Sequence, residues 1–198
     1  MRSRMTSRRR GALVASVLLA VTALAGCTAS DGIAEQGDGG YISGDGSIVT
    51  IPAADREPAP EWSGPTQDGG SVGSADLDGV TVLNFWYASC PPCRAEAGDL
   101  EELAQRFDGE VPFLGVNVRD RAETAQAFMD EFGVTYPTVI DVETRDVVSA
   151  FAGQVPPTAV PTTLVLDAEG RVAVRIAGRI PGVTTVADLI DAVLAEAP

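Results

Sequence analysis

The sequence contains no histidine, only three cysteines, and half as many basic as acidic residues. Zinc usually takes four nitrogen and sulfur ligands, so no metal site is expected in a chain with so few of them. Three cysteines are also too few for the disulfide framework of a small secreted scaffold. The shortage of basic residues argues against nucleic-acid binding, because phosphate is repelled by an acidic surface. No sequence feature calls for a cofactor.

The first 26 residues show the order of charge and hydropathy that is typical of an export signal. Residues 1–10 carry five arginines and no acid, and residues 11–25 form an apolar run broken only by Ser16 and Thr22. The run is shorter than the about 20 apolar residues that span a bilayer comfortably. We therefore predict a signal peptide over residues 1–26, with a retained signal anchor as the alternative. The arginines before the run are compatible with export by either the Sec or the twin-arginine (Tat) route.

Leu24-Ala25-Gly26-Cys27 resembles the lipobox of bacterial lipoproteins. The resemblance implies that Cys27 is lipidated and that the protein sits on the extracytoplasmic face of the cell membrane. Ordinary cleavage that leaves Cys27 as a free thiol is the alternative. Removal of the signal leaves nine basic against 28 acidic residues, a formal charge of −19. Because anionic lipid repels such a chain, attachment would depend on acyl groups and not on a basic patch.

The composition of the remaining chain predicts a tether followed by one folded domain. Residues 27–60 are rich in small and polar residues and predict a flexible tether, in which only residues 47–51 could pair as a strand. Residues 61–198 are long enough for one domain with its own core. No internal repeat and no second domain are evident.

The hydrophobic pattern of residues 61–198 predicts an α/β fold with a mixed sheet flanked by helices. We expect an N-terminal hairpin over 62–72, a buried strand over 80–87, a helix from 91, a strand over 111–118, a helix over 121–132, a short extended segment over 138–141, a helical turn over 144–151, a hairpin over 162–176, and a last helix to 196. Thr184 or Thr185 is expected to cap the last helix. Glu101 and Glu102 are expected on a solvated helix face.

Cys90-Pro91-Pro92-Cys93 directly follows the apolar strand and is the most informative motif of the chain. Two thiols at this spacing can form and reopen a small disulfide ring. A helix that begins at Cys90 would place that sulfur near unpaired backbone N–H groups and the positive end of the helix dipole, which favour thiolate. We expect Cys90 to be the more exposed, attacking thiol and Cys93 the resolving thiol. Half of a metal site is the alternative interpretation of the motif.

Residues 84–94, Asn-Phe-Trp-Tyr-Ala-Ser-Cys-Pro-Pro-Cys-Arg, resemble the active-site strand and helix start of thioredoxins, and Val160-Pro161-Thr162-Thr163 resembles their cis-proline loop. The closest likeness is to the TlpA/ResA-like branch of exported, membrane-tethered members. The resemblance implies a thioredoxin fold with a central insertion, which residues 122–155 could supply. It also implies a cis Val160–Pro161 peptide that offers the Val160 backbone to substrate; a trans proline is the alternative.

The same resemblance assigns a role to Glu96, three residues after Cys93. In ResA-like proteins the glutamate at this spacing is implicated in tuning the thiols, although a carboxylate in a first helical turn is also favourable to the dipole alone. Two positions depart from thioredoxin. Asn84 replaces a buried aspartate, which leaves Glu96 as the local carboxylate, and Ser89 replaces the usual tryptophan.

The expected function is dithiol–disulfide exchange with protein cysteines outside the cytoplasmic membrane. The resemblance suggests reduction of apocytochrome c thiols before haem attachment, with electrons from a membrane thiol donor of the CcdA/DsbD kind. Three alternatives remain open: an oxidase that installs disulfides in secreted proteins, a lipid-tethered Cu(I) chaperone, and a peroxiredoxin-like peroxidase. The last would need a threonine where the chain has Tyr87, and copper carriers usually add a histidine.

Overall fold

The structure is a computed structural model that describes residues 40, 42–45, 47–154 and 159–196. The predicted signal peptide and Cys27 lie outside the described residues. The helices and strands are β1 (Ile48–Thr50), β2 (Ser63–Pro65), β3 (Ser71–Gly73), β4 (Thr81–Trp86), α1 (Pro91–Arg106), β5 (Phe113–Asn117), α2 (Ala122–Phe132), β6 (Thr138–Ile140), α3 (Asp146–Ala150), β7 (Thr162–Leu166), β8 (Val172–Ala177) and α4 (Val183–Leu194), with 3₁₀ turns at Ala53–Asp55 and Ser74–Asp76. None of the helices in the described ranges is long and apolar enough to cross a membrane.

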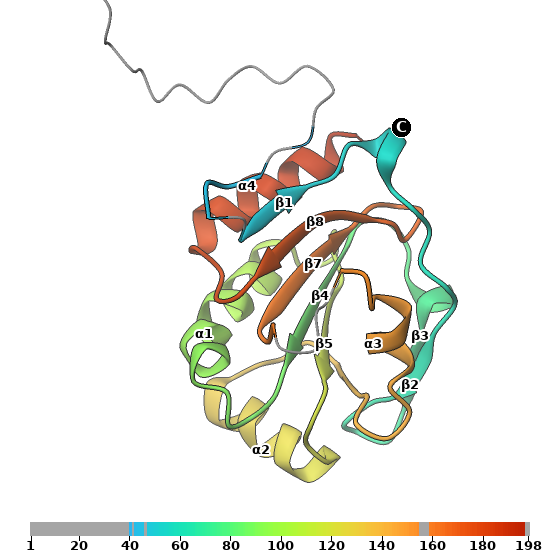
Figure 1. The fold of residues 1–198 in the computed structure, drawn as a ribbon. Coiled ribbons are helices and arrows are strands. Elements are labelled where there is room, and N and C mark those ends of the chain that lie inside the picture. The colour runs from blue at the N-terminus through green and yellow to red at the C-terminus, as the bar shows by residue number, and fades with distance from the viewer. Residues whose placement is uncertain (1–39, 41, 46, 155–158, 197–198) are drawn as a thin grey trace, which may run out of the picture. The chain divides into compact units, whose positions relative to one another are not determined.

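A six-stranded mixed sheet forms the centre of the domain, in the order β1-β8-β7-β4-β5-β6. β4, β5 and β6 run parallel, and β7, β8 and β1 alternate in direction beyond β4 (Figure 1). Every residue of β4 is buried, as expected for a central strand with a continuous apolar sequence. The predicted α/β fold with a mixed sheet is confirmed.

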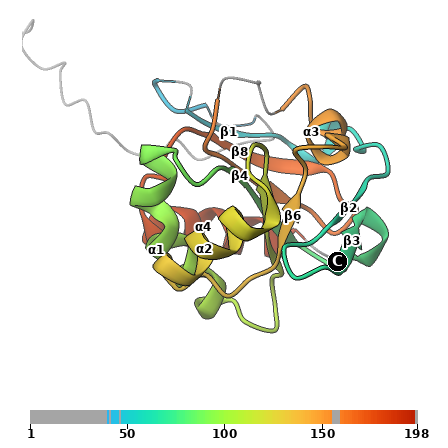
Figure 2. The ribbon, with the colours of Figure 1, turned by 90° about the horizontal axis from the view of Figure 1, so that it is seen from below.

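Successive side chains of β4 point to opposite faces of the sheet. Helices cover both of these faces. Val82 and Val165 pack with the apolar side chains of α1 and α4, whereas Leu83 and Phe85 pack with α3 and the β2–β3 hairpin. Figure 2 shows α1, α2 and α4 gathered apart from α3, β2 and β3. Asn84 and Trp86 therefore point to the α1 side of the sheet.

The segment between β5 and β7, where the insertion was expected, adds α2, β6 and α3. β6 pairs in parallel with β5 and extends the sheet, and an isolated bridge between Thr66 and Val139 joins the hairpin to β6. Gly133 ends α2 in the left-handed conformation, at φ 70°, which agrees with the predicted end of this helix at residue 132.

Residues 48–50, in the part of the predicted tether that the sequence allowed as a strand, form β1, which pairs with residues 174–176 of β8. The expected cap of the last helix is wrong. The last helix begins after Gly182 and not at a threonine. Gly182 has φ 141°, a conformation that side chains rarely adopt, so backbone geometry outweighs the capping preference of Thr184 and Thr185.

Arg56 connects the segment after β1 to the residues that follow β7 and α4. Its guanidinium lies 3.2 Å from Asp167 and 2.7 Å from Glu196, and its Nε donates to the Ile51 carbonyl at 2.8 Å. The Arg56 side chain is only 4% exposed. A buried cation with this many partners belongs to a folded segment, so residues 51–56 do not form part of a free tether.

Candidate active site

The dithiol lies where the buried strand β4 turns into α1. β4 ends at Trp86, a short turn follows, and Cys90 is the N-cap residue of α1. Cys93 lies one turn into the helix, and the two residues form a disulfide with their Cα atoms 5.3 Å apart. The strand–turn–helix setting that the motif predicted is confirmed.

The sulfur of Cys90 lies at the positive end of the helix. The N–H of Cys93 donates to Cys90 Sγ at 3.2 Å. Pro91 and Pro92 occupy the first two helical positions and have no N–H, so Cys93 supplies the first amide hydrogen of the helix. That hydrogen and the helix dipole both stabilise negative charge on Cys90 once the disulfide is reduced.

The cis-proline loop approaches the disulfide from β7. The Val160–Pro161 peptide is cis, as predicted, and the Val160 carbonyl oxygen lies 3.9 Å from Cys90 Sγ. The Pro161 carbonyl accepts from the N–H of Gly178 at 2.8 Å, and the Thr162 hydroxyl donates to the Ala159 carbonyl. These bonds hold the loop against the neighbouring β8 segment and beside the dithiol.

The expected difference in exposure between the two cysteines is not present in the disulfide form. Cys90 is 1% exposed and Cys93 is 3% exposed. Cys90 is covered because the Val160 segment lies over its sulfur, which the position of the residue at the helix start could not reveal. Access of a substrate sulfur to Cys90 therefore involves the residues of the cis-proline loop.

Glu96 is buried on the inner side of α1, directly behind the dithiol. Its Oε1 accepts from Asn84 Nδ2 at 3.1 Å and its Oε2 accepts from the N–H of Ile180 at 2.9 Å. Asn84 Nδ2 also donates to the hydroxyl of Thr163 at 3.0 Å. The structure thus brings together Asn84 and Glu96, the two residues singled out from the sequence, and adds Ile180 as a partner that the sequence did not indicate.

Burial raises the pKa of Glu96 to about 7, although the hydrogen bonds from Ile180 and Asn84 act in the opposite direction. A carboxyl group with a pKa near neutrality can both accept and return a proton under physiological conditions. Glu96 is therefore suited to move protons to and from Cys93, which lies one helical turn before it on α1.

The raised pKa of Glu96 gives a testable dependence of stability on pH. The folded protein binds the proton more tightly than the unfolded chain does, so the contribution is complete below pH 4.5 and is lost as the pH rises to about 7. We expect the free energy of unfolding to fall by about 3 kcal/mol across this range and Glu96→Gln to remove the fall. Urea unfolding at several pH values measures it. Glu102→Gln on the exposed face of α1 is the control, and an equal slope in the Glu96 variant would contradict the assignment.

A second polar cluster braces the turn before Cys90, and the sequence analysis missed it. Asp120 Oδ2 accepts from the N–H of Ala88 at 2.6 Å and from Asn117 Nδ2 at 3.0 Å. The guanidinium of Arg119 lies 4.3 Å from the centroid of the Tyr87 ring. Ala88 and Asp120 are 32 residues apart, so only the pairing of β4 with β5 brings them together. The cluster fixes the backbone that leads into the dithiol.

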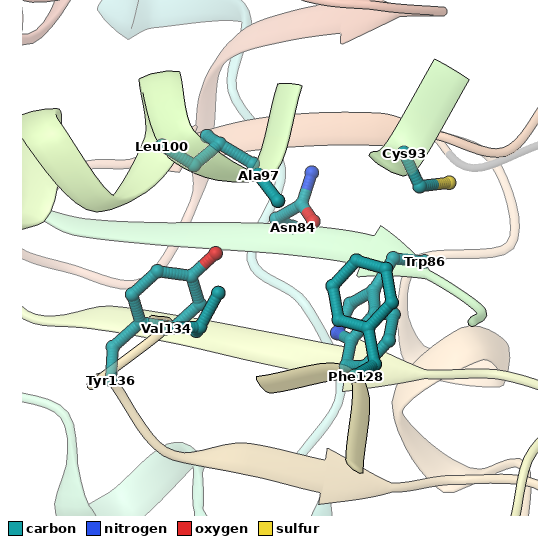
Figure 3. A pocket seen from close by; sticks show the side chains of 8 residues that line it. All are labelled: Asn84, Trp86, Cys93, Ala97, Leu100, Phe128, Val134 and Tyr136. Atoms are coloured by element: carbon teal, nitrogen blue, oxygen red, sulfur yellow. The ribbon is translucent and has the colours of Figure 1, made fainter. Parts of the chain in front are cut away.

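Glu101 also lies in an unexpected environment. It is 6% exposed rather than solvated, and it accepts from both the N–H and the hydroxyl of Thr135 at 2.8 Å. The sequence placed Glu101 on the outer face because its neighbour Glu102 is charged as well, but only Glu102 is exposed. Glu101 anchors the segment that carries Tyr136, which lines a small cavity beside Cys93 (Figure 3).

Comparison with known proteins places this site in a family. A model of the AhpC/TSA family matches residues 56–175. The thiol-disulfide oxidoreductase ResA of Halalkalibacterium halodurans is 33% identical over 107 residues, which cover 53% of this chain and 58% of that protein. For this ResA protein and three further relatives, the matched region covers between 51% and 65% of the relative's own length.

Two solved structures match over more of their length. A DsbF homologue from Corynebacterium diphtheriae superposes with a TM-score of 0.68 at 32% identity, covering 77% of this chain and 96% of that one. A secreted thiol-disulfide isomerase from Corynebacterium glutamicum gives 0.69 at 30% identity, covering 80% and 100%. The family model spans more than half of the sequence, so the chain belongs to the AhpC/TSA family of thioredoxin-like proteins.

Proposed function

We propose that the protein is an exported thiol–disulfide oxidoreductase that acts on cysteines of other proteins through Cys90 and Cys93. The observation that carries the proposal is the disulfide at the start of α1 with the cis Val160–Pro161 peptide 3.9 Å from Cys90 Sγ. The relatives whose names include thiol-disulfide oxidoreductase support the same chemistry.

The geometry supports a two-step exchange. In the reduced protein the Cys90 thiolate attacks a substrate disulfide, forms a mixed disulfide and releases one substrate sulfur as a thiol. Cys93 then attacks Cys90 Sγ, the bond between Cys90 and the substrate breaks, and the second substrate thiol leaves. The substrate gains two electrons and two protons, and the protein loses them as its disulfide closes. Glu96 holds the proton that Cys93 gives up until the departing sulfur takes it.

Val160 is the proposed docking point for the substrate chain. Its backbone lies beside Cys90, and the adjoining strand β7 begins at Thr162. An extended substrate segment could pair with the Val160 backbone as an added strand and so present its sulfur to Cys90. No side-chain specificity is needed for such pairing, which suits an enzyme with several protein substrates.

The proposed physiological role is reductive. The name of one relative, a DsbE homologue of Paracoccus denitrificans at 37% identity over 100 residues, supports a place in the same group of interchange proteins. We propose that apocytochrome c is a substrate and that a membrane thiol donor restores the dithiol. A reduction potential near about −250 mV or lower supports this direction, and one near about −120 mV overturns it in favour of disulfide formation.

Anchoring at Cys27 completes the proposal. The sequence of residues 1–27 supports export followed by acylation of Cys27, which would hold the domain on the outer face of the cell membrane. Mass spectrometry of the membrane-extracted protein tests it. A lipid-sized mass increase on Cys27 supports the anchor, and an unmodified Cys27 thiol overturns it.

Trapping tests the function directly. Cys93→Ala expressed in the native host is expected to accumulate disulfide-linked complexes through Cys90, because the resolving thiol is missing. Mass spectrometry of complexes cut from non-reducing gels identifies the partners. The double variant Cys90→Ala/Cys93→Ala is the control and is expected to form none. Absence of complexes from Cys93→Ala would contradict an exchange mechanism and would return Cu(I) binding to consideration.

A further inference from the structure

The surface beside Cys90 differs from that of thioredoxins, because Ser89 stands where a tryptophan usually precedes the first cysteine. Ser89 is exposed and carries no ring. The aromatic side chain of this turn belongs to Tyr87, which is partly buried against the cluster that contains Trp86, Cys90 and Cys93. The Tyr87 carbonyl accepts from the N–H of Cys90 at 3.1 Å. Tyr87 is therefore part of the turn that carries the reactive sulfur.

The guanidinium of Arg119 lies over the Tyr87 ring. Its Cζ is 4.3 Å from the ring centroid, well inside the distance of about 6 Å at which a cation and an aromatic face attract each other. A planar guanidinium that stacks on a ring still presents N–H groups at its edges. Arg119 is exposed, so these N–H groups are open to an incoming molecule. The pair thus holds a positive charge beside the turn that leads to Cys90.

The loop that carries Arg119 is bonded to the end of β5 and to the dithiol turn. Asn117 Oδ1 accepts from the N–H of Arg119 at 3.1 Å and from the N–H of Asp120 at 2.7 Å. Asp120 Oδ2 in turn accepts from the N–H of Ala88 at 2.6 Å. Because β4 and β5 are parallel neighbours, the segments that follow them lie at the same edge of the sheet. The loop is therefore ordered before a partner arrives, which lowers the entropic cost of a contact with Arg119.

The charge of Arg119 is not balanced by an ion pair, although the protein is strongly acidic. Residues 27–198 contain nine arginines and 28 acidic residues. Within the described ranges, five of these arginines form ion pairs, whereas Arg119 and Arg121 form none. Arg121 is exposed on the same loop. Asp120 lies between them in the sequence, but its carboxylate is bonded to Ala88 and Asn117. The rim of the dithiol therefore offers positive charge to a partner.

We propose that Arg119 is a specificity-determining residue: its guanidinium, held on Tyr87 beside Cys90, favours substrate segments that carry a carboxylate next to the reacting cysteine. The inference rests on the proposed function and adds a side-chain preference to the backbone pairing at Val160. A guanidinium binds a carboxylate with two parallel N–H···O bonds, which fixes the orientation of the bound group. An aspartate or glutamate beside the substrate cysteine meets this requirement.

The selection is local and modest in size. The field of the whole acidic protein attracts basic partners over long distances, so the favoured substrate is a neutral or basic protein with an acidic residue close to its cysteine. Exposed ion pairs change an equilibrium by a factor of up to about five, and we expect a factor of about three here. Any effect of the Arg119 charge on thiolate formation at Cys90 acts on all substrates alike and does not select among them.

Alkylation of Cys90 tests the charge without a protein substrate. The background Cys27→Ala/Cys93→Ala leaves Cys90 as the one thiol of the sequence. Its rates of reaction with iodoacetate, which carries a carboxylate, and with iodoacetamide, which does not, are measured at the same pH and at low salt. The ratio of the two rates reports the charge near the sulfur, because thiolate reactivity and access to Cys90 affect both reagents.

Arg119→Gln is expected to lower the ratio of the iodoacetate rate to the iodoacetamide rate about threefold, and Arg119→Glu about tenfold. Arg106→Gln is the matched control. It removes the same charge from an exposed position at the other end of α1, about 22 Å from the start of the helix, and is expected to leave the ratio unchanged. A disturbed fold would change both rates and not produce a fall graded with charge. Equal ratios in the three variants and the parent protein would overturn the proposal.

Peptide disulfides extend the test to exchange. Three peptides that differ only in the residue beside the cysteine, which is glutamate, glutamine or lysine, are reduced by the dithiol form of the protein. We expect the glutamate peptide to react about threefold faster than the glutamine peptide, the lysine peptide to react slowest, and Arg119→Gln to remove the difference between glutamate and glutamine. A preference for glutamate that survives in Arg119→Gln would refute the role of Arg119.

Failure of this inference is separable from failure of the proposed function. Reduction of all three peptides at one rate, with an alkylation ratio that ignores Arg119, refutes only the specificity. Reduction of none of them, with an alkylation ratio that falls in Arg119→Gln, refutes only the exchange activity and leaves the cation beside Cys90 established.

Discussion

Cys90→Ala is expected to abolish thiol–disulfide exchange, with the rate falling at least about a thousandfold. Cys90 is the sulfur that receives the Cys93 N–H at 3.2 Å and lies beside Val160, so it is the thiol that can ionise and meet a substrate. Cys93 lacks both features and does not replace it. Turnover of a model peptide disulfide, followed by release of its thiols, measures the effect.

Two further variants test whether the loss of exchange is specific to Cys90. Cys27→Ala removes the remaining cysteine outside the site and is expected to leave exchange by the purified protein unchanged. Cys93→Ala is expected to stop turnover after one equivalent of mixed disulfide has formed. Exchange that continues in Cys90→Ala would show that the roles of the two thiols have been assigned in the wrong order.

Arg56→Ala is expected to lower the free energy of unfolding by about 3 kcal/mol, which is large for a residue that the sequence placed in a tether. The change leaves buried Asp167 with Arg171 as its one cationic partner among the described residues, and it removes the bond to Ile51. Burial pushes the pKa of Asp167 upward, but the hydrogen bonds from Arg171 and Arg56 outweigh it and hold the pKa below its ordinary value. The stability from this pair is therefore present above the unfolded pKa of Asp167 and is lost as the pH falls through the folded one.

Denaturant unfolding at neutral pH measures the effect of Arg56→Ala. Arg106→Ala is the matched control, because Arg106 and Asp191 form an ion pair whose side chains are 48% and 52% exposed, and its loss is expected to cost less than about 1 kcal/mol. A similar small effect for both arginines would show that residues 51–56 contribute little to the stability of the domain.

The sequence could predict the dithiol unit because its signals are local. The apolar run of β4, the spacing of Cys90 and Cys93, and the prolines that start α1 lie within 16 residues and need no knowledge of distant segments. The cis-proline followed from a short motif that resembles a known loop. The position of Glu96 on α1 followed from helical spacing.

The polar partners could not be predicted, because each pairs residues that are distant in the sequence. Ile180 and Glu96 are separated by 84 positions, and Arg56 and Asp167 by 111. These pairs depend on where loops cross the ends of the sheet, which hydrophobic periodicity does not record. The sequence could not decide between strand and tether for residues 48–50 for a related reason. A three-residue strand becomes recognisable only when its partner in β8 is known.

Strand β1 also limits how far the dithiol can travel. If the chain is acylated at Cys27, as proposed, the length before Ile42, which bridges to Val49 of β1, spans at most about 50 Å, whereas a tether that continued to residue 60 would reach about 115 Å. Pairing of the last part of the tether with the sheet therefore shortens its reach by more than half. Under the proposed anchoring, the domain would stay in a thinner layer above the bilayer, where membrane-bound donors and newly exported chains meet it at a higher local concentration.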